Sequence, residues 1–133
     1  MYAGGISTET DYPYFAEDEA CTVEASTYAL EVEGGSVNIT EGDEVSLANA
    51  VYSAGPVSVA FEVYGDFRDY TSGVYSSDGC GNTAMDVNHA VLSVGYGAED
   101  GMDYWKVKNS WGADWGDEGF FKIQRGVNMC GIA

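Results

Sequence analysis

Two neighbouring segments with alternating apolar residues constrain the fold of this chain more than any other feature. In residues 89–96, small or polar positions alternate with apolar ones, and residues 102–109 carry aromatic and β-branched side chains. Both patterns predict β-strands. Residues 97–101 between them are polar and bounded by glycine, which is typical of a turn. The sequence therefore predicts an antiparallel hairpin as the centre of the fold.

The register of this hairpin decides which polar side chains meet. We expect Tyr96 to pair with Met102 across the turn, and in that register His89 lies directly opposite Asn109. His89 is the only histidine of the chain. An isolated histidine is most often an imidazole without a chemical task, but an imidazole held by an amide is a familiar arrangement for orienting a catalytic base. His89 and Asn109 are therefore the first candidates for a functional site.

Residues 40–54 are predicted to form the main helix. Thr40 and Asp43 have the spacing of a capping arrangement, and Gly55 followed by Pro56 ends the helical pattern. The apolar face of this helix is predicted to consist of Val45, Ala48 and Tyr52, with Leu47 and Val51 beside them.

Further strands complete the predicted fold. Apolar residues alternate most clearly in residues 57–63 and 119–125, and shorter strands are expected at 28–37 and 74–75. One helix and about five antiparallel strands are typical of a small barrel or a strongly bent sheet. The predicted fold class is α+β, as a mostly antiparallel, barrel-like β domain with one main helix.

The charge of the chain excludes several classes of partner. Its 22 acidic and 5 basic side chains give a net charge of −17, which argues against nucleic acid and against anionic membrane surfaces. No apolar run is long enough to span a bilayer, and no signal peptide is recognisable at Met1. With 45% hydrophobic residues in 133, the chain is expected to bury a core of its own.

The three cysteines raise the question of a metal site. Cys21, Cys80 and Cys130 could ligate zinc together with His89, but the chain lacks the short paired spacing that such sites use. We therefore expect no metal and no other cofactor. An odd number of cysteines also indicates that one thiol has no partner within the chain.

Several short motifs follow one another through nearly the whole chain. They are Gly4-Gly5-Ile6, Tyr12-Pro13-Tyr14, Gly73-Val74-Tyr75-Ser76-Ser77, Asn88-His89-Ala90-Val91, Gly95-Tyr96-Gly97, Lys108-Asn109-Ser110-Trp111-Gly112, Trp115-Gly116 and Asn128-Met129-Cys130-Gly131. Together and in this order, they resemble the papain-like cysteine peptidases, and most closely their cathepsin H and aleurain branch.

The resemblance implies a role for three residues of the site. His89 would be the base that takes a proton from a cysteine thiol, giving a thiolate–imidazolium pair. Asn109 would accept a hydrogen bond from the imidazole and orient it. Trp111 would cover this contact and keep water away from it, although its side chain also suits a packing role.

The resemblance also implies substrate contacts and a disulfide. Ala60 and Val87 would line part of a substrate side-chain pocket, and the backbone carbonyl of Asn88 would bind substrate main chain. Cys80 and Cys130 match positions that are bonded to each other in the relatives. Peptides or proteins are the implied substrates, and a lysosomal, vacuolar or secreted location is implied as well.

The nucleophile segment of the family, Cys-Gly-Ser-Cys-Trp, does not occur in this sequence. The chain therefore resembles the C-terminal portion of such a peptidase, and its implied partner is an N-terminal helical domain that carries the nucleophile cysteine. Residues 1–20 would form a strap that belongs to the interdomain region, and residues 21–133 would form the β domain with the catalytic His and Asn. Alone, the chain is expected to be inactive as a peptidase.

Two other functions are compatible with the sequence. A truncated, non-enzymatic β domain could act as a binding or interaction module through its exposed former domain interface. A carbohydrate-binding module would explain the many tyrosines and tryptophans, but it would not explain why His89 and Asn109 face each other.

Overall fold

The computed structural model describes residues 4–31 and 34–133. The chain divides into two compact units, residues 1–38 and residues 39–133, and each is described by itself. The second unit carries His89 and Asn109, and it is the unit that determines the geometry of the candidate site.

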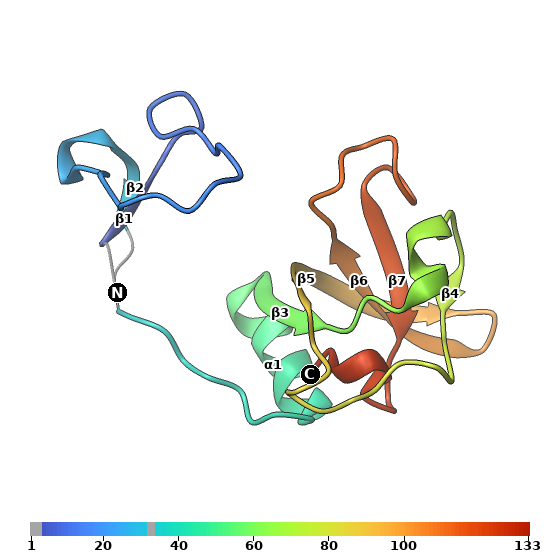
Figure 1. Cartoon of the computed structure of the whole chain (residues 1–133). Helices are drawn as coiled ribbons and strands as arrows, with labels where there is room; N and C mark the ends of the chain where they lie inside the picture. Colours follow the sequence, from blue (N-terminus) through green and yellow to red (C-terminus); the bar gives the residue numbers. More distant parts are fainter. Residues whose placement is uncertain (1–3, 32–33) are drawn as a thin grey trace. The chain divides into compact units, whose positions relative to one another are not determined.

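The first unit contains a two-stranded antiparallel sheet. Strand β1 spans Gly5–Ser7 and pairs with β2, Tyr28–Glu31, which follows the short 3-10 helix η1, Ala25–Thr27 (Figure 1). The Ser7 and Thr27 hydroxyls form a hydrogen bond of 2.9 Å, which links the end of β1 to the end of η1. The strand predicted at 28–37 is therefore present at its beginning, and residues 32–33 of that prediction lie outside the described residues.

The second unit is built on a five-stranded sheet with the order β3-β5-β6-β7-β4. All neighbouring strands are antiparallel except β4 and β7, which are parallel. The strands are β3, Val57–Phe61; β4, Val74–Tyr75; β5, His89–Glu99; β6, Met102–Lys108; and β7, Phe120–Gln124. The prediction of an α+β fold with mostly antiparallel strands and one main helix is confirmed. The predicted barrel-like domain is not a closed barrel in the described residues, because β3 and β4 remain at the two edges of the sheet.

The main helix, α1, spans Glu44–Ala54 and lies beside β3 (Figure 1). It begins later than predicted, because Asp43 provides the cap by accepting a hydrogen bond from the Ser46 backbone N–H at 2.9 Å. Its buried side chains are Leu47 and Val51, one helical turn apart.

The prediction that Val45 and Tyr52 belong to the buried face of α1 is wrong. Their side chains are 73% and 84% exposed. The rotation of the helix is fixed by Glu44, whose carboxylate accepts hydrogen bonds from the Trp105 indole N–H and from the Gly126 backbone N–H. With Glu44 turned toward the sheet, the residues three and seven positions later face it as well.

The core lies against one face of the sheet and under α1. In β7, Phe121 and Ile123 are fully buried, as the alternation predicts, and Phe61 at the end of β3 joins them. Two short 3-10 helices, η2 at Gly65–Asp69 and η3 at Met129–Gly131, each add one fully or nearly fully buried side chain. These residues are Phe67 and Cys130.

The predicted register of the central hairpin is wrong by three positions. Strand β5 continues to Glu99, which pairs with Met102, and Tyr96 pairs with Trp105 instead. The turn contains only Asp100 and Gly101, with φ angles of 50° and 82°. An Asp-Gly pair with both φ angles positive forms the two-residue turn whose twist suits a hairpin, so the strands extend into the segment that was expected to be loop.

Candidate active site

The side chains of His89 and Asn109 form a hydrogen bond, His89 Nε2 to Asn109 Oδ1, at 2.9 Å. They meet although they are not directly opposite each other. A bulge between Ser93 and Gly95 shifts the β5–β6 register by one residue, so that the last pair is Leu92 with Lys108. If this register continues by one residue, Asn109 lies opposite Val91. His89 is two residues before Val91, so its side chain lies on the same face of the sheet, diagonally across from Asn109.

Neighbouring backbone groups hold both residues of the pair. His89 is the first residue of β5 and pairs with Phe61 at the end of β3. Asn109 follows β6 directly, and its backbone N–H donates to the Gly119 carbonyl at 2.9 Å. Only 8% of Asn109 is exposed, whereas His89 is half-buried. The amide is therefore fixed in the structure while the imidazole can still be approached from outside.

The hydrogen bonds of Asn109 determine the tautomer of His89. Asn109 Oδ1 also accepts from the Ser110 backbone N–H at 2.8 Å, and because a backbone N–H can only donate, this end of the amide is the oxygen. His89 Nε2 must then be the donor in its contact with Oδ1. In the neutral imidazole this leaves the lone pair on Nδ1, which is free to accept a proton.

Trp111 packs against the imidazole. The ring centroids of His89 and Trp111 lie 5.1 Å apart, with an angle of 34° between the planes. Trp111 in turn packs edge-on against Trp115 at 4.8 Å, and Trp115 contacts the buried Phe67. This aromatic cluster therefore packs against the imidazole ring of His89 through Trp111.

The loop between β6 and β7 brings Trp111 and Trp115 to the site. It turns at Gly116, which has a φ angle of 62°. A Cβ atom at this position would lie 2.6 Å from the Phe120 carbonyl oxygen, so the close approach of the two backbone segments requires glycine.

His89 and Trp111 share a surface pocket with Val63, Arg68 and Asn88. The Asn88 side chain accepts a hydrogen bond from the Val63 backbone N–H at 2.8 Å, which ties the loop before β5 to the segment after β3. Asn88 is thus brought together with His89. Arg68 and Val63 were not predicted as site residues. Arg68 belongs to η2, and so short a helix carries no periodic signal; its rarity as a cation was the only indication. Val63 lies in the segment 57–63, whose alternation predicted a strand but no site.

Ala60 and Val87 do not line this pocket. Ala60 pairs with Ala90, on the face of β3 opposite to that of the buried Phe61. Val87 lies close to Gly131, where a Cβ atom would be 3.2 Å from Val87 Cγ1. Neither of these two predicted substrate contacts therefore contributes to the pocket that contains His89.

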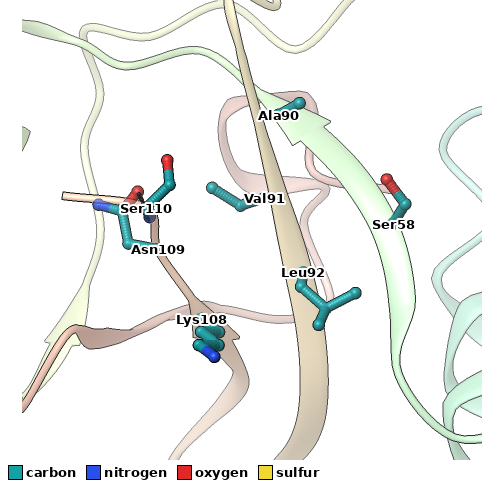
Figure 2. A pocket seen from close by; sticks show the side chains of 7 residues that line it. All are labelled: Ser58, Ala90, Val91, Leu92, Lys108, Asn109 and Ser110. Carbon is teal, nitrogen blue, oxygen red and sulfur yellow. Dashed lines mark hydrogen bonds between the residues drawn. The ribbon is translucent and has the colours of Figure 1, made fainter. Parts of the chain in front are cut away.

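A second surface pocket reaches Asn109 from another side. Figure 2 shows Asn109 and Ser110 facing β5, with Ser58 on the neighbouring strand beyond it. Its lining residues are Ser58, Ala90, Val91, Leu92, Lys108, Asn109 and Ser110. It provides no titratable group besides Lys108.

Within residues 4–31 and 34–133, no free thiol accompanies His89 in the second unit. Cys80 and Cys130 are joined by a disulfide, and the free, exposed Cys21 belongs to the first unit. The same residues contain no group of three His, Cys, Asp or Glu side chains that could hold a metal ion. None of the helices in this described part is long and apolar enough to cross a membrane. Among the described residues of the second unit, the His89–Asn109 pair is therefore not accompanied by a free thiol.

Comparison with known proteins identifies the family of this chain. The model of the family described as "Papain family cysteine protease" matches residues 1–133. The chain is 58% identical over 130 residues to the thiol protease aleurain of Arabidopsis thaliana, covering 98% of the chain and 36% of that protein. Its identity to the pro-cathepsin H of mouse is 50% over 133 residues, which is the whole chain and 40% of that protein.

A solved structure agrees with the sequence relatives. The digestive procathepsin L2 proteinase from the larval midgut of Tenebrio molitor superimposes with a TM-score of 0.87 at 45% sequence identity, covering 98% of the chain and 41% of that structure. The chain spans little more than a third of the length of its plant relatives. The chain belongs to the papain family of cysteine proteases, as its motifs predict.

Proposed function

We propose that this chain supplies the general base of a papain-type cysteine peptidase, with His89 as the base and Asn109 as the residue that orients it. The observation that carries the proposal is the hydrogen bond between His89 Nε2 and Asn109 Oδ1 at 2.9 Å. It directs the free Nδ1 lone pair away from Asn109, where an incoming thiol could reach it.

The reaction would proceed in two stages. Nδ1 takes the proton of a cysteine thiol, and the resulting thiolate attacks the peptide carbonyl carbon. The imidazolium then protonates the nitrogen of the departing amine, which leaves a thioester acyl-enzyme. In the second stage the imidazole takes a proton from water, the hydroxide displaces the thiolate, and the free acid is released.

Asn109 suits this cycle because an amide oxygen accepts the Nε2–H in both protonation states of the ring. It orients the imidazole without placing a full negative charge beside it, so the imidazolium is not stabilised so strongly that it retains its proton. Trp111, 5.1 Å from the imidazole, shields the contact from water and so strengthens it.

The nucleophile cysteine is proposed to come from an N-terminal helical domain outside these 133 residues. The substrate would be a peptide or protein whose main chain is bound by the backbone carbonyl of Asn88, and Ala60 and Val87 would line part of a substrate side-chain pocket. Residues 1–20 would form a strap toward the helical domain. The Cys80–Cys130 disulfide supports an oxidising compartment, such as a lysosome, a vacuole or the secretory route.

A chimera tests this proposal. The 133 residues replace the matching segment of the Arabidopsis aleurain, so that a helical domain with a nucleophile cysteine is present. We expect the chimera to hydrolyse a fluorogenic peptide amide in a reaction that thiol alkylation abolishes, and the 133-residue chain alone to show no turnover. A folded but inactive chimera, beside an active aleurain, would refute the proposal.

A second candidate function is a non-enzymatic binding module. It is favoured by the observation that no free thiol of the described residues lies in the second unit with His89. The chimera separates the two functions. An active chimera requires the imidazole of His89 in the tautomer that catalysis needs, whereas a binding module does not.

A further inference from the structure

The pocket that contains His89 also contains a cation that the reaction described above does not use. Arg68, Val63, Asn88, His89 and Trp111 line this pocket together. The Arg68 guanidinium carbon lies 5.6 Å from the centroid of the Trp111 ring, and the same ring lies 5.1 Å from that of His89. Trp111 therefore contacts both the imidazole and the guanidinium.

The backbone of Arg68 is anchored on both sides. It belongs to η2, and its neighbour Phe67 is fully buried in the core. The Arg68 carbonyl accepts a hydrogen bond from the Trp115 indole N–H at 2.9 Å. The start of the side chain is thus fixed by the core, while the residue itself is exposed. Stacking on Trp111 limits the directions that the guanidinium can take.

The Arg68 guanidinium has no anionic partner among the described residues. Across residues 4–31 and 34–133 the ion pairs join Lys122 to Glu99 and Arg125 to Asp103. Arg68 remains unpaired in a chain with 22 acidic and 5 basic side chains. A guanidinium has five N–H donors in a planar fork that matches a carboxylate, and here these donors are open to a ligand.

We propose that Arg68 is a specificity-determining residue that binds a carboxylate of the substrate on the side of the departing amine. This inference rests on the function proposed for His89. The imidazolium must reach the amine nitrogen to protonate it, so the residue that carries this nitrogen lies beside His89. Arg68 shares that pocket. It can bind an acidic side chain of that residue, or the free C-terminal carboxylate when that residue is the last one.

Binding to the 133-residue chain tests the proposal without catalysis. The probes are N-acetyl-glutamate N-methylamide, its glutamine counterpart, and N-acetylglycine with a free carboxylate. We expect at least one carboxylate probe to shift the NMR signal of the Trp111 indole N–H, and the glutamine probe to leave it in place. The responding probe identifies the source of the carboxylate.

Two variants separate a specific site from general attraction. Arg68→Gln should abolish the shift, and Lys106→Gln, which removes the same charge from β6, should retain it. Absence of a shift with either carboxylate, or an equal shift in Arg68→Gln, would overturn the proposal. These results do not depend on whether the chimera is active.

Kinetics of the chimera provide a second readout. A substrate with glutamate directly after the cleaved bond should have a kcat/KM about two- to fivefold above that of the glutamine substrate, the value of one exposed ion pair. The difference should lie in KM, and Arg68→Glu should transfer the preference to lysine. An active chimera without this preference would overturn the role of Arg68 and leave that of His89 intact.

Discussion

At the scale of single residues, the site depends on the position of one oxygen atom. Asn109 Oδ1 accepts from the Ser110 backbone N–H and from His89 Nε2, and both contacts are shorter than 3 Å. The backbone contact assigns the oxygen, and the oxygen assigns the imidazole tautomer. The tautomer of His89 is thus set by an oxygen atom of a neighbouring side chain.

His89→Ala and Asn109→Ala should affect the chimera to different degrees. Loss of His89 removes the proton transfer, so kcat should fall by about 10²- to 10⁴-fold. Loss of Asn109 leaves the base but allows the ring to rotate away from its productive position, which should cost about 10²-fold. Steady-state kinetics with a peptide amide measure both, and an Asn109→Ala chimera with full kcat would contradict the orienting role.

At the scale of the elements, the hairpin shows how much the sequence can predict. The alternation in β5 and β6 predicts both strands, and the contact of His89 with Asn109 is present. The predicted register was wrong, because Asp100 and Gly101 form a two-residue turn and the bulge after Ser93 compensates for only part of the shift. Alternation shows which residues share a face, but turn type and bulges decide which residues are opposite.

The buried face of α1 and the contribution of Arg68 to the pocket could not be predicted from the sequence, for other reasons. The spacing of Val45 and Tyr52 matches a buried face as well as that of Leu47 and Val51 does, and only the hydrogen bonds of Glu44 with distant segments decide between them. Arg68 lies in a short 3-10 helix, and its stacking on Trp111 depends on packing between segments far apart in the chain.

The helix cap gives a prediction with a defined pH dependence. Hydrogen bonds from Ser46 hold the pKa of the Asp43 carboxyl below its ordinary value of 3.8. Its contribution to stability is therefore complete above that value, and it is lost as the pH falls through the lowered pKa of the folded state. Asp43→Ala should lower Tm at pH 7, and this difference should shrink below about pH 4.

Asp43→Asn is the matched control for the cap. An asparagine side chain can also accept from the Ser46 N–H, so this variant should retain more of the Tm at pH 7 than Asp43→Ala does. Because it cannot titrate, its Tm relative to Asp43→Ala should change little with pH. Thermal unfolding followed by circular dichroism between pH 3 and pH 7 checks both statements, and an Asp43→Ala variant as stable as the parent at pH 7 would contradict them.

The disulfide connects η3 to the segment before β5. It joins residues separated by 50 positions, so in the chain-entropy account it stabilises the fold by about 4 kcal/mol. The double variant Cys80→Ala, Cys130→Ala should lose stability of this order in urea unfolding. Cys21→Ala, which removes the exposed free thiol, should leave the unfolding midpoint unchanged. Equal midpoints for the parent and the double variant would contradict the estimate.

At the scale of the whole molecule, a large negative charge is balanced by few cations. Four of the five basic side chains lie over aromatic rings: Arg68 over Trp111, Lys106 over Phe120, Lys122 over Tyr104, and Arg125 over Tyr96 and Trp105. The carboxylates have few counterions within the protein, so their mutual repulsion opposes the compact state.

Salt should therefore stabilise this protein at neutral pH. Screening shortens the range of repulsion from about 30 Å at 0.01 M salt to about 10 Å at 0.1 M. We expect Tm at pH 7 to rise with sodium chloride over this interval, and the same rise to be smaller at pH 5, where some carboxylates begin to protonate. Differential scanning calorimetry measures it, and a Tm that falls with salt would show that attractive charge pairs dominate.

The scarcity of cations also determines where a protease that cuts after basic residues can cleave this chain. The first 67 residues contain no lysine or arginine, and Lys106, Lys108 and Lys122 lie within β6 and β7. An enzyme that cuts after basic residues finds only Arg68 and Arg125 outside the strands, and Arg125 is held by its backbone hydrogen bond to the Asp103 carbonyl. Trypsin is thus directed to η2, the 3-10 helix that contributes Arg68 to the pocket with His89, and a cut there would separate the part of the chain that holds His89 from all that precedes it.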